Sequence, residues 1–436
     1  MTGERACLNI LLKVTKEDAY LNLALKEGLK GVDSKDKPRL TALVYNTVEH
    51  IGYCDFLIAH YAKGRLHSQI RGILRMAVAE LLFMNTPDYA VCSKAVKLTA
   101  EIGKAGLKGY VNGVLRAVAR DHENDSLPAL PSDFVKRMSI TSSYPEFLVA
   151  EYAKTYGEAF TEEMLTAPVK GVSVRPVPPF TADELETLLV SRGLTPKKSR
   201  IVDGAFVIDS LGGALDDDTD FHDGRFTVQS EGAMLAVRCL DPKEGMTVLD
   251  ACAAPGGKTS YMLDLMNNKG DMTAWELHPH RAELTEKTLK RLGRELKCTV
   301  RDSSVYDYFF ADRFDRVLLD VPCSGLGAGS KPDARFRRTE DDVKRLSRIQ
   351  RSILDTCSKY VKVGGILVYS TCTISKAENE DVIKAFIDNN RGFELMPVSG
   401  SISEDIKKRG ENGMLQLFPN TDGVDGFFIA KLRRNA

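Results

Sequence analysis

The stretch DACAAPGGKT, Asp250–Thr259, decides the fold of the larger part of this chain. It directly follows the apolar run Thr247–Leu249, so a strand would lead into a turn that contains two glycines. In open α/β sheets, ligands bind beyond the carboxyl ends of the strands. Gly256 and Gly257 would let the backbone approach such a ligand closely. The stretch matches neither the phosphate-binding P-loop nor the dinucleotide-binding GxGxxG turn, and alone it could be a purely structural turn.

Outward from this turn, short apolar runs alternate with helical patterns. The later runs read MTAWE, KCTVRD, RVLLDVP and GILVYSTC, and a helical repeat over residues 341–361 separates the last two. Such alternation is typical of a doubly wound parallel sheet. Residues 231–436 are therefore predicted to form an α/β, Rossmann-like domain. The final pair LQLFPN and GFFIAKL predicts an antiparallel hairpin at its edge.

The first part of the chain has a different pattern. Within residues 1–140, apolar residues recur at three- and four-residue steps, as in Ile70, Ile73, Leu74 and Ala77, which predicts an all-helical domain. Residues 141–230 mix short strands with a helix that follows Thr181, so a small α+β module is expected there. The chain is thus predicted to be multidomain, with three domains.

Composition excludes several classes of protein. The 436 residues are 43% apolar and 28% charged, which is typical of a globular protein. No apolar run is long enough to span a membrane, and the start of the chain lacks the pattern of a signal peptide. Nine cysteines occur without a CxxC pair, so we expect neither a disulfide framework nor a metal site. These features favour a cytoplasmic location.

Acidic residues follow the next two predicted strands. Glu276 ends the second strand, where a carboxylate could bind ribose hydroxyls, and Asp302 follows the third, where it could accept from an adenine amino group. Together with Asp250 they predict a cofactor that contains adenosine.

Two cysteines follow the fourth and fifth strands. Cys323 lies in DVPCSG after Asp320, and Cys372 lies in STCT. A lone cysteine is usually a packing residue, but two at neighbouring strand ends suggest a catalytic pair. The reaction that needs such a pair is alkylation of a pyrimidine carbon. C5 of cytosine becomes nucleophilic only when a thiolate adds at C6, after which a base removes the C5 proton and the thiol leaves. The second cysteine can assist release, and Asp320 is placed to hold the base edge. An enzyme acting on a base must also draw it out of its stack.

Two basic segments suggest a polyanionic partner. Lys94–Arg120 carries six basic residues and one acidic residue, and includes Lys97, Lys104 and Lys108. In the second, Arg335, Arg337 and Arg338 surround Phe336, a combination that suits phosphates and unstacked bases. A solvated helix face is the alternative for both segments.

These motifs resemble the RNA cytosine-C5 methyltransferases of the Sun/Fmu (NOL1/NOP2/Sun) family, and most of all its bacterial members that act on 16S ribosomal RNA. The resemblance covers essentially the whole chain. It implies S-adenosylmethionine as cofactor, Cys372 as nucleophile and Cys323 as the residue that aids product release. The cofactor-binding positions that it implies are Cys252, Ala253, Ala254, Pro255, Gly256, Gly257, Lys258, Glu276, Asp302 and Asp320.

The resemblance also covers the other two domains. Residues 1–140 are similar to the helical RNA-binding domain of the NusB type, and residues 141–230 to the family's RRM-like, ferredoxin-like insert. Together they imply ribosomal RNA as partner, within a small-subunit precursor or alone. Glu276 stands where the family usually has aspartate, but the carboxylate is kept. The alternatives are the same chemistry on tRNA and a non-catalytic RNA-binding assembly factor.

Overall fold

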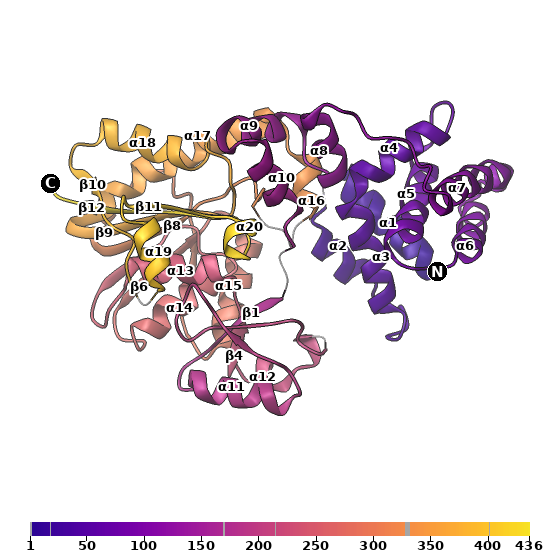
Figure 1. Ribbon diagram of the computed structural model, residues 1–436. Helices are drawn as coiled ribbons and strands as arrows, with labels where there is room; N and C mark the ends of the chain where they lie inside the picture. The colour runs from indigo at the N-terminus through magenta and orange to yellow at the C-terminus, as the bar shows by residue number, and fades with distance from the viewer. Residues whose placement is uncertain (1, 18, 169–170, 214, 328–331, 401) are drawn as a thin grey trace. The chain divides into compact units, whose positions relative to one another are not determined.

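The computed structural model describes the chain apart from residues 1, 18, 169–170, 214, 328–331 and 401 (Figure 1). It divides into two compact units. The first comprises residues 1–166 and 331–339, and the second comprises residues 167–330 and 340–436. No helix among the described residues combines the length and the apolar character needed to cross a bilayer.

The first unit is all-helical. Its core consists of apolar side chains such as Leu8, Val44, Leu74 and Leu115, which are fully buried. Its helices are α1 (Gly3–Lys16), α2 (Leu21–Gly28), α3 (Lys37–Glu49), α4 (Ile51–Tyr61), α5 (Ser68–Phe83), α6 (Asp88–Glu101), α7 (Lys108–Glu123), α8 (Phe134–Ser142), α9 (Glu146–Tyr156), α10 (Glu158–Thr166) and α16 (Pro332–Arg337). The predicted helical domain is thus present.

This unit extends further than the sequence pattern indicates. The helices continue past residue 140 to Thr166, and α16 joins them from a distant part of the chain. Phe336 of α16 packs on the helical core, and the Asp333 carboxylate accepts a hydrogen bond from the Leu21 N–H at 3.3 Å. The chain therefore leaves the second unit after the DVPCSG motif and returns to it at Glu340.

The second unit begins with a small antiparallel sheet. Its strands are β1 (Val172–Pro176), β2 (Lys197–Lys198), β3 (Phe206–Ile208) and β4 (Phe226–Val228), in the order β2-β3-β1-β4. The helix α11 (Ala182–Ser191) begins with the capping box expected at Thr181, because Thr181 and Glu184 bond each other's backbone N–H groups. An antiparallel sheet with a helix, as expected of a small α+β module, is thus present within residues 172–228.

The main sheet has the order β10-β12-β9-β8-β5-β6-β7, with β11 paired to β12. Its parallel strands are β5 (Thr247–Asp250), β6 (Asp271–Glu276), β7 (Cys298–Val300), β8 (Phe314–Asp320) and β9 (Val361–Thr371). The antiparallel ones are β10 (Phe393–Leu395), β11 (Met414–Leu417) and β12 (Phe427–Arg434). The predicted β11–β12 hairpin forms at the edge of the sheet: β12 pairs with β9 on one side, and with β11 and β10 on the other.

Helices cover both faces of this sheet, because strand residues alternate between them. Val248 faces α13 (Glu231–Leu240) and α14 (Gly257–Leu265). Leu249 faces the other layer, which contains α17 (Glu340–Cys357) and α18 (Glu380–Asn389), as Figure 1 shows. The remaining helices are α12 (Thr219–His222), α15 (Pro279–Arg291), α19 (Glu404–Arg409) and α20 (Pro419–Asp422).

Strand order reverses between β5 and β8, which are neighbours in the sheet. A crevice at such a switch point is where open α/β sheets bind ligands. The motifs DACAAPGGKT and DVPCSG follow these two strands.

Candidate active site

The sequence motifs meet at one edge of the sheet. Asp250, Glu276, Asp320 and Thr371 end β5, β6, β8 and β9, and Cys372 follows directly. Carboxyl ends of parallel strands meet at the same edge, so the topology gathers these residues. The expectation that they share a rim is therefore met by the strand register.

The turn after β5 is a close-packed cradle. Gly256 has φ +99°, and a Cβ there would lie 3.1 Å from the Thr285 carbonyl oxygen, so glycine is required. Ala253 and Ala254 are buried, Pro255 is exposed, and the Ala253 N–H donates to the Trp275 carbonyl at 2.8 Å. Cys252 is half-buried and packs with the apolar layer that contains Leu249; burial raises the pKa of its thiol.

Asp250 is buried beneath this turn. Its Oδ2 accepts a hydrogen bond from the Thr259 hydroxyl at 2.7 Å, while Oδ1 is buried and lacks a partner among the described residues. Burial raises the pKa of Asp250 to about 7, and the nearby Asp320 adds to this shift. A buried acceptor without a partner is costly, and a ligand donor or a proton would satisfy it.

The other two acids differ in exposure. Glu276 is 4% exposed, and its Oε1 accepts from the His278 N–H at 3.1 Å. Asp302 is exposed, and its Oδ1 accepts from the Ser304 N–H at 2.9 Å and hydroxyl at 2.6 Å. Carboxylates on successive strands, beside a glycine turn, fit the hydroxyl and amino groups of adenosine.

Asp320 lies between two donors. The Lys258 ammonium lies 2.6 Å from its Oδ2, and the Ser370 hydroxyl donates to its Oδ1 at 2.9 Å. Lys258 also lies over the ring of Phe427, 5.5 Å from the centroid. The turn after β5 and the end of β8 are thus joined by an ion pair. The sequence placed both residues at the site but did not predict this contact.

The two cysteines lie side by side. The Sγ atoms of Cys323 and Cys372 are 3.3 Å apart, which is longer than a disulfide bond of about 2.05 Å. Both side chains are half-buried. The hydrogen bond with Cys372 raises the pKa of the Cys323 thiol, and burial raises it further. One sulfur can therefore keep a proton and donate it to the other.

Glu378 fixes the loop that carries Cys323. This fully buried carboxylate accepts from the Ser324 N–H at 2.9 Å, the Ser324 hydroxyl at 2.5 Å and the Gln350 side chain at 2.9 Å. Gln350 also donates to the Pro322 carbonyl at 2.9 Å. Residues on both sides of Cys323 are held in this way.

Asn379 does the same for Cys372. Its Oδ1 accepts from the Thr371 hydroxyl at 2.6 Å, and its Nδ2 donates to the Thr373 carbonyl at 3.0 Å. Sequence reasoning missed Glu378 and Asn379, because the letters AENED carry no signal of burial. Their position shortly after STCT is the only hint.

The predicted RNA-contacting arginines have internal partners. The Arg337 guanidinium donates to the Val14 and Ala19 carbonyls at 2.5 Å, and Arg335 lies over the Tyr144 ring and 3.9 Å from Glu49. Their side chains are 13% and 12% exposed. These contacts attach α16 to the first unit. Arg338 is half-buried.

The lysines of the first unit are arranged differently. Lys97 and Lys108 are exposed and Lys104 is half-buried. At the two ends of the basic run, Lys94 pairs with Glu80 at 2.8 Å and Arg120 with Asp121 at 2.8 Å. The described residues contain no group of three or more histidine, cysteine or acidic side chains that could hold a metal.

Comparison with known proteins identifies the family. Residues 237–433 match the model of the 16S rRNA methyltransferases RsmB/F, and residues 4–120 match the NusB family. The chain is 34% identical over 442 residues to a probable ribosomal RNA small subunit methyltransferase B of Bacillus subtilis, covering 98% of this chain and 97% of that one. The chain belongs to this methyltransferase family. Its members are S-adenosylmethionine-dependent RNA methyltransferases.

Solved structures agree with this family. The crystal structure of PH0851 matches 99% of this chain and 98% of its own, with a TM-score of 0.83 and 26% identity. NSun6 from Pyrococcus horikoshii, solved with SFG, matches 67% of this chain and 98% of its own, with a TM-score of 0.58. At 24% identity the second match shows the fold alone. The methyltransferase fold and the NusB-like helical fold are confirmed.

Proposed function

We propose that this family member methylates C5 of a cytosine in 16S ribosomal RNA, through a covalent bond between Cys372 and C6. The observation that carries the proposal is the pair of thiols 3.3 Å apart, at the sheet edge that also holds Asp250, Glu276 and Asp320. A methyltransferase acting on an exocyclic nitrogen or a ribose oxygen has no use for two adjacent thiols.

The two thiols have different roles in this proposal. The Cys372 thiol gives its proton to a base, and the resulting thiolate adds to C6. After C5 is methylated, a base takes the C5 proton, the C5–C6 double bond re-forms and the bond between C6 and Cys372 breaks. The Cys323 thiol, whose pKa is raised, keeps its proton and donates to the departing thiolate. Release should therefore depend on Cys323.

The acidic residues and Lys258 bind and orient the base and the cofactor. Asp320 accepts from the cytosine N4 amino group or protonated N3, and Lys258 orients that carboxylate. Glu276, Asp302 and the Cys252–Lys258 turn hold S-adenosylmethionine, which when bound supplies an electrophilic methyl group. The buried Oδ1 of Asp250 supports a polar ligand at this turn.

RNA contacts are proposed for both basic segments. Lys97, Lys104 and Lys108 are the better candidates, because the described residues give them no ion pair. Arg335 and Arg337 use their guanidinium groups within the first unit, so their contribution would be to position α16. Arg338 remains a proposed contact. We propose that the protein acts in the cytoplasm, on a small-subunit precursor or on its RNA.

The test is methyl transfer from radiolabelled S-adenosylmethionine to unmodified small-subunit RNA, followed by bisulfite mapping. We expect 5-methylcytosine with the wild-type chain and with Cys92→Ala, whose cysteine lies in the first unit, and none with Cys372→Ala. Methylation of tRNA but not of small-subunit RNA would show that tRNA is the substrate. An absence of transfer to any RNA, with RNA binding intact, would favour an assembly factor.

A further inference from the structure

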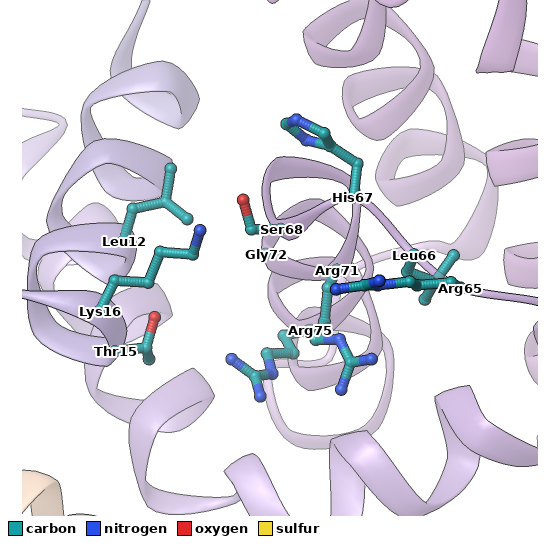
Figure 2. A pocket seen from close by; sticks show the side chains of 10 residues that line it. All are labelled: Leu12, Thr15, Lys16, Arg65, Leu66, His67, Ser68, Arg71, Gly72 and Arg75. Carbon is teal, nitrogen blue, oxygen red and sulfur yellow. The ribbon is translucent and has the colours of Figure 1, made fainter.

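A basic hollow lies in the first unit, between the end of α1 and the start of α5. Its volume is about 510 Å³, within the range of ligand pockets. The residues that line it are Leu12, Thr15, Lys16, Arg65, Leu66, His67, Ser68, Arg71, Gly72 and Arg75. Figure 2 shows Thr15 and Lys16 on the α1 side, with Arg65, Arg71 and Arg75 opposite. This site is separate from the lysines of the Lys94–Arg120 run.

The two helices that border the hollow are closely packed. Gly72 of α5 meets α1 so closely that a Cβ would lie 2.7 Å from Leu8 Cδ1. Leu8 and its neighbours belong to the buried core. The cationic side chains therefore project from a packed base, which lowers the entropy cost of holding them together.

The charge of the hollow is mostly uncompensated. Arg75 pairs with Asp55 through two hydrogen bonds, of 2.7 and 2.5 Å. Lys16, Arg65 and Arg71 form no ion pair with any described residue, and all three are exposed. Like charges repel each other, so three such cations gathered around one hollow favour a polyanion.

The start of α5, a 16-residue helix, also contributes to the hollow. His67 accepts from the Gln69 N–H at 3.3 Å and so caps the helix. The Ser68 hydroxyl lines the hollow, and the positive end of the helix dipole lies at the same place. These groups suit the oxygens of a phosphodiester.

We propose that the hollow binds the phosphate backbone of the RNA substrate, with Lys16, Arg65 and Arg71 as its cationic contacts. Only the identification of the ligand as the substrate RNA rests on the proposed function. Phosphate contacts carry no sequence information and fix how an RNA is placed. The hollow would thus contribute affinity and orientation, while the cysteine site selects the base.

The experiment compares two double variants of the full chain. Arg65→Gln with Arg71→Gln removes two of the contacts, while Lys30→Gln with Lys37→Gln removes two exposed charges outside the hollow. Affinity for small-subunit RNA is measured across a salt series. We expect the arginine variant to bind about 10-fold more weakly at about 0.1 M salt, with a salt slope about 1.5 units shallower. The lysine control should match the wild type within about twofold.

Other readouts separate the two proposals. The arginine variant should keep its affinity for S-adenosylmethionine, and its methylation rate at saturating RNA should match the wild type. Equal affinity and slope for wild type and arginine variant would overturn the RNA site, even if methylation is confirmed. An equal loss in the lysine control would overturn it too. A wild-type chain that binds RNA through the hollow but transfers no methyl group would refute only the proposed reaction.

Discussion

Glu378 and Asn379, consecutive in sequence, hold the two cysteine loops separately: Glu378 bonds Ser324 beside Cys323, and Asn379 bonds Thr371 beside Cys372. Both residues directly precede α18. One short turn therefore supports both loops. The 3.3 Å separation of the sulfurs also depends on direct contacts between the loops, because Asp320 pairs with Ser370 in the sheet and the Ser324 and Thr373 hydroxyls are 2.9 Å apart.

Replacing Glu378 by Gln should disturb the Cys323 loop. The amide has one acceptor oxygen and a donor that would face the donors of Ser324 and Gln350. We expect a loss of about 1–3 kcal/mol in stability, the cost of an unsatisfied buried group. We also expect a fall in kcat, with accumulation of covalent protein–RNA adduct. The exposed Glu283→Gln is the matched control, and a stability loss without adduct would reduce Glu378 to a purely structural role.

The roles of the two cysteines can be distinguished by trapping the covalent protein–RNA adduct. Cys372→Ala should bind RNA but form no adduct, because the proposed nucleophile is missing. Cys323→Ala should accumulate a protein–RNA species that survives denaturing gel electrophoresis, since addition proceeds while release stalls. The reverse pattern of adducts would exchange the two assignments.

Asp302→Ala should weaken S-adenosylmethionine binding by about 1.5–3 kcal/mol, the scale of a lost charge-assisted hydrogen bond. Calorimetry on the full chain measures this directly. Ser304→Ala is a useful companion, because Ser304 donates to Asp302 and orients it. An unchanged affinity in the aspartate variant would mean that the carboxylate does not contact the cofactor.

Asp250 should make stability depend on pH. Burial raises its pKa to about 7, against about 3.9 in an unfolded chain. Between these two pH values Asp250 is protonated in the folded chain and ionised in the unfolded chain. Stability therefore falls as pH rises from about 4 to about 7. Asp250→Asn should gain stability relative to wild type by up to about 1.4 kcal/mol per pH unit in that window. Urea denaturation at several pH values would show it, and a difference constant with pH would contradict the shift.

The lysines of the first unit are best tested by substitution. Lys97→Gln, Lys104→Gln and Lys108→Gln together should reduce the salt slope of RNA binding by up to about one unit per lost contact. Deleting residues 1–140 is a poorer test, because it would expose Phe336 and remove most of the residues that α16 contacts. Identical slopes for triple variant and wild type would identify this run as a solvated face.

Local patterns in the sequence predicted the elements well. The strands β5 to β9, the capped helix α11 and the helical first part all follow from hydrophobic period and turn residues. The strand-end acids and the two cysteines followed too, because parallel strands present their carboxyl ends at one edge.

Features that depend on distant contacts could not be predicted. The apolar run that begins at Phe427 does not reveal that β12 pairs with β9 on one side and with both β10 and β11 on the other. Lys16 and Arg71 are far apart in sequence and line the same hollow only because α1 packs on α5 at Gly72. The burial of Glu378 likewise arises from packing between separate helices and loops.

The interior position of β12 has a consequence for synthesis on the ribosome. The strand β9 is complete at Thr371, but the strand that pairs with its outer side begins only at Phe427. Until then, the emerging chain exposes an unpaired strand edge, which is prone to pair with other chains. The second unit can thus complete its main sheet only late in translation. We expect the nascent polypeptide to benefit from a chaperone that shields this edge.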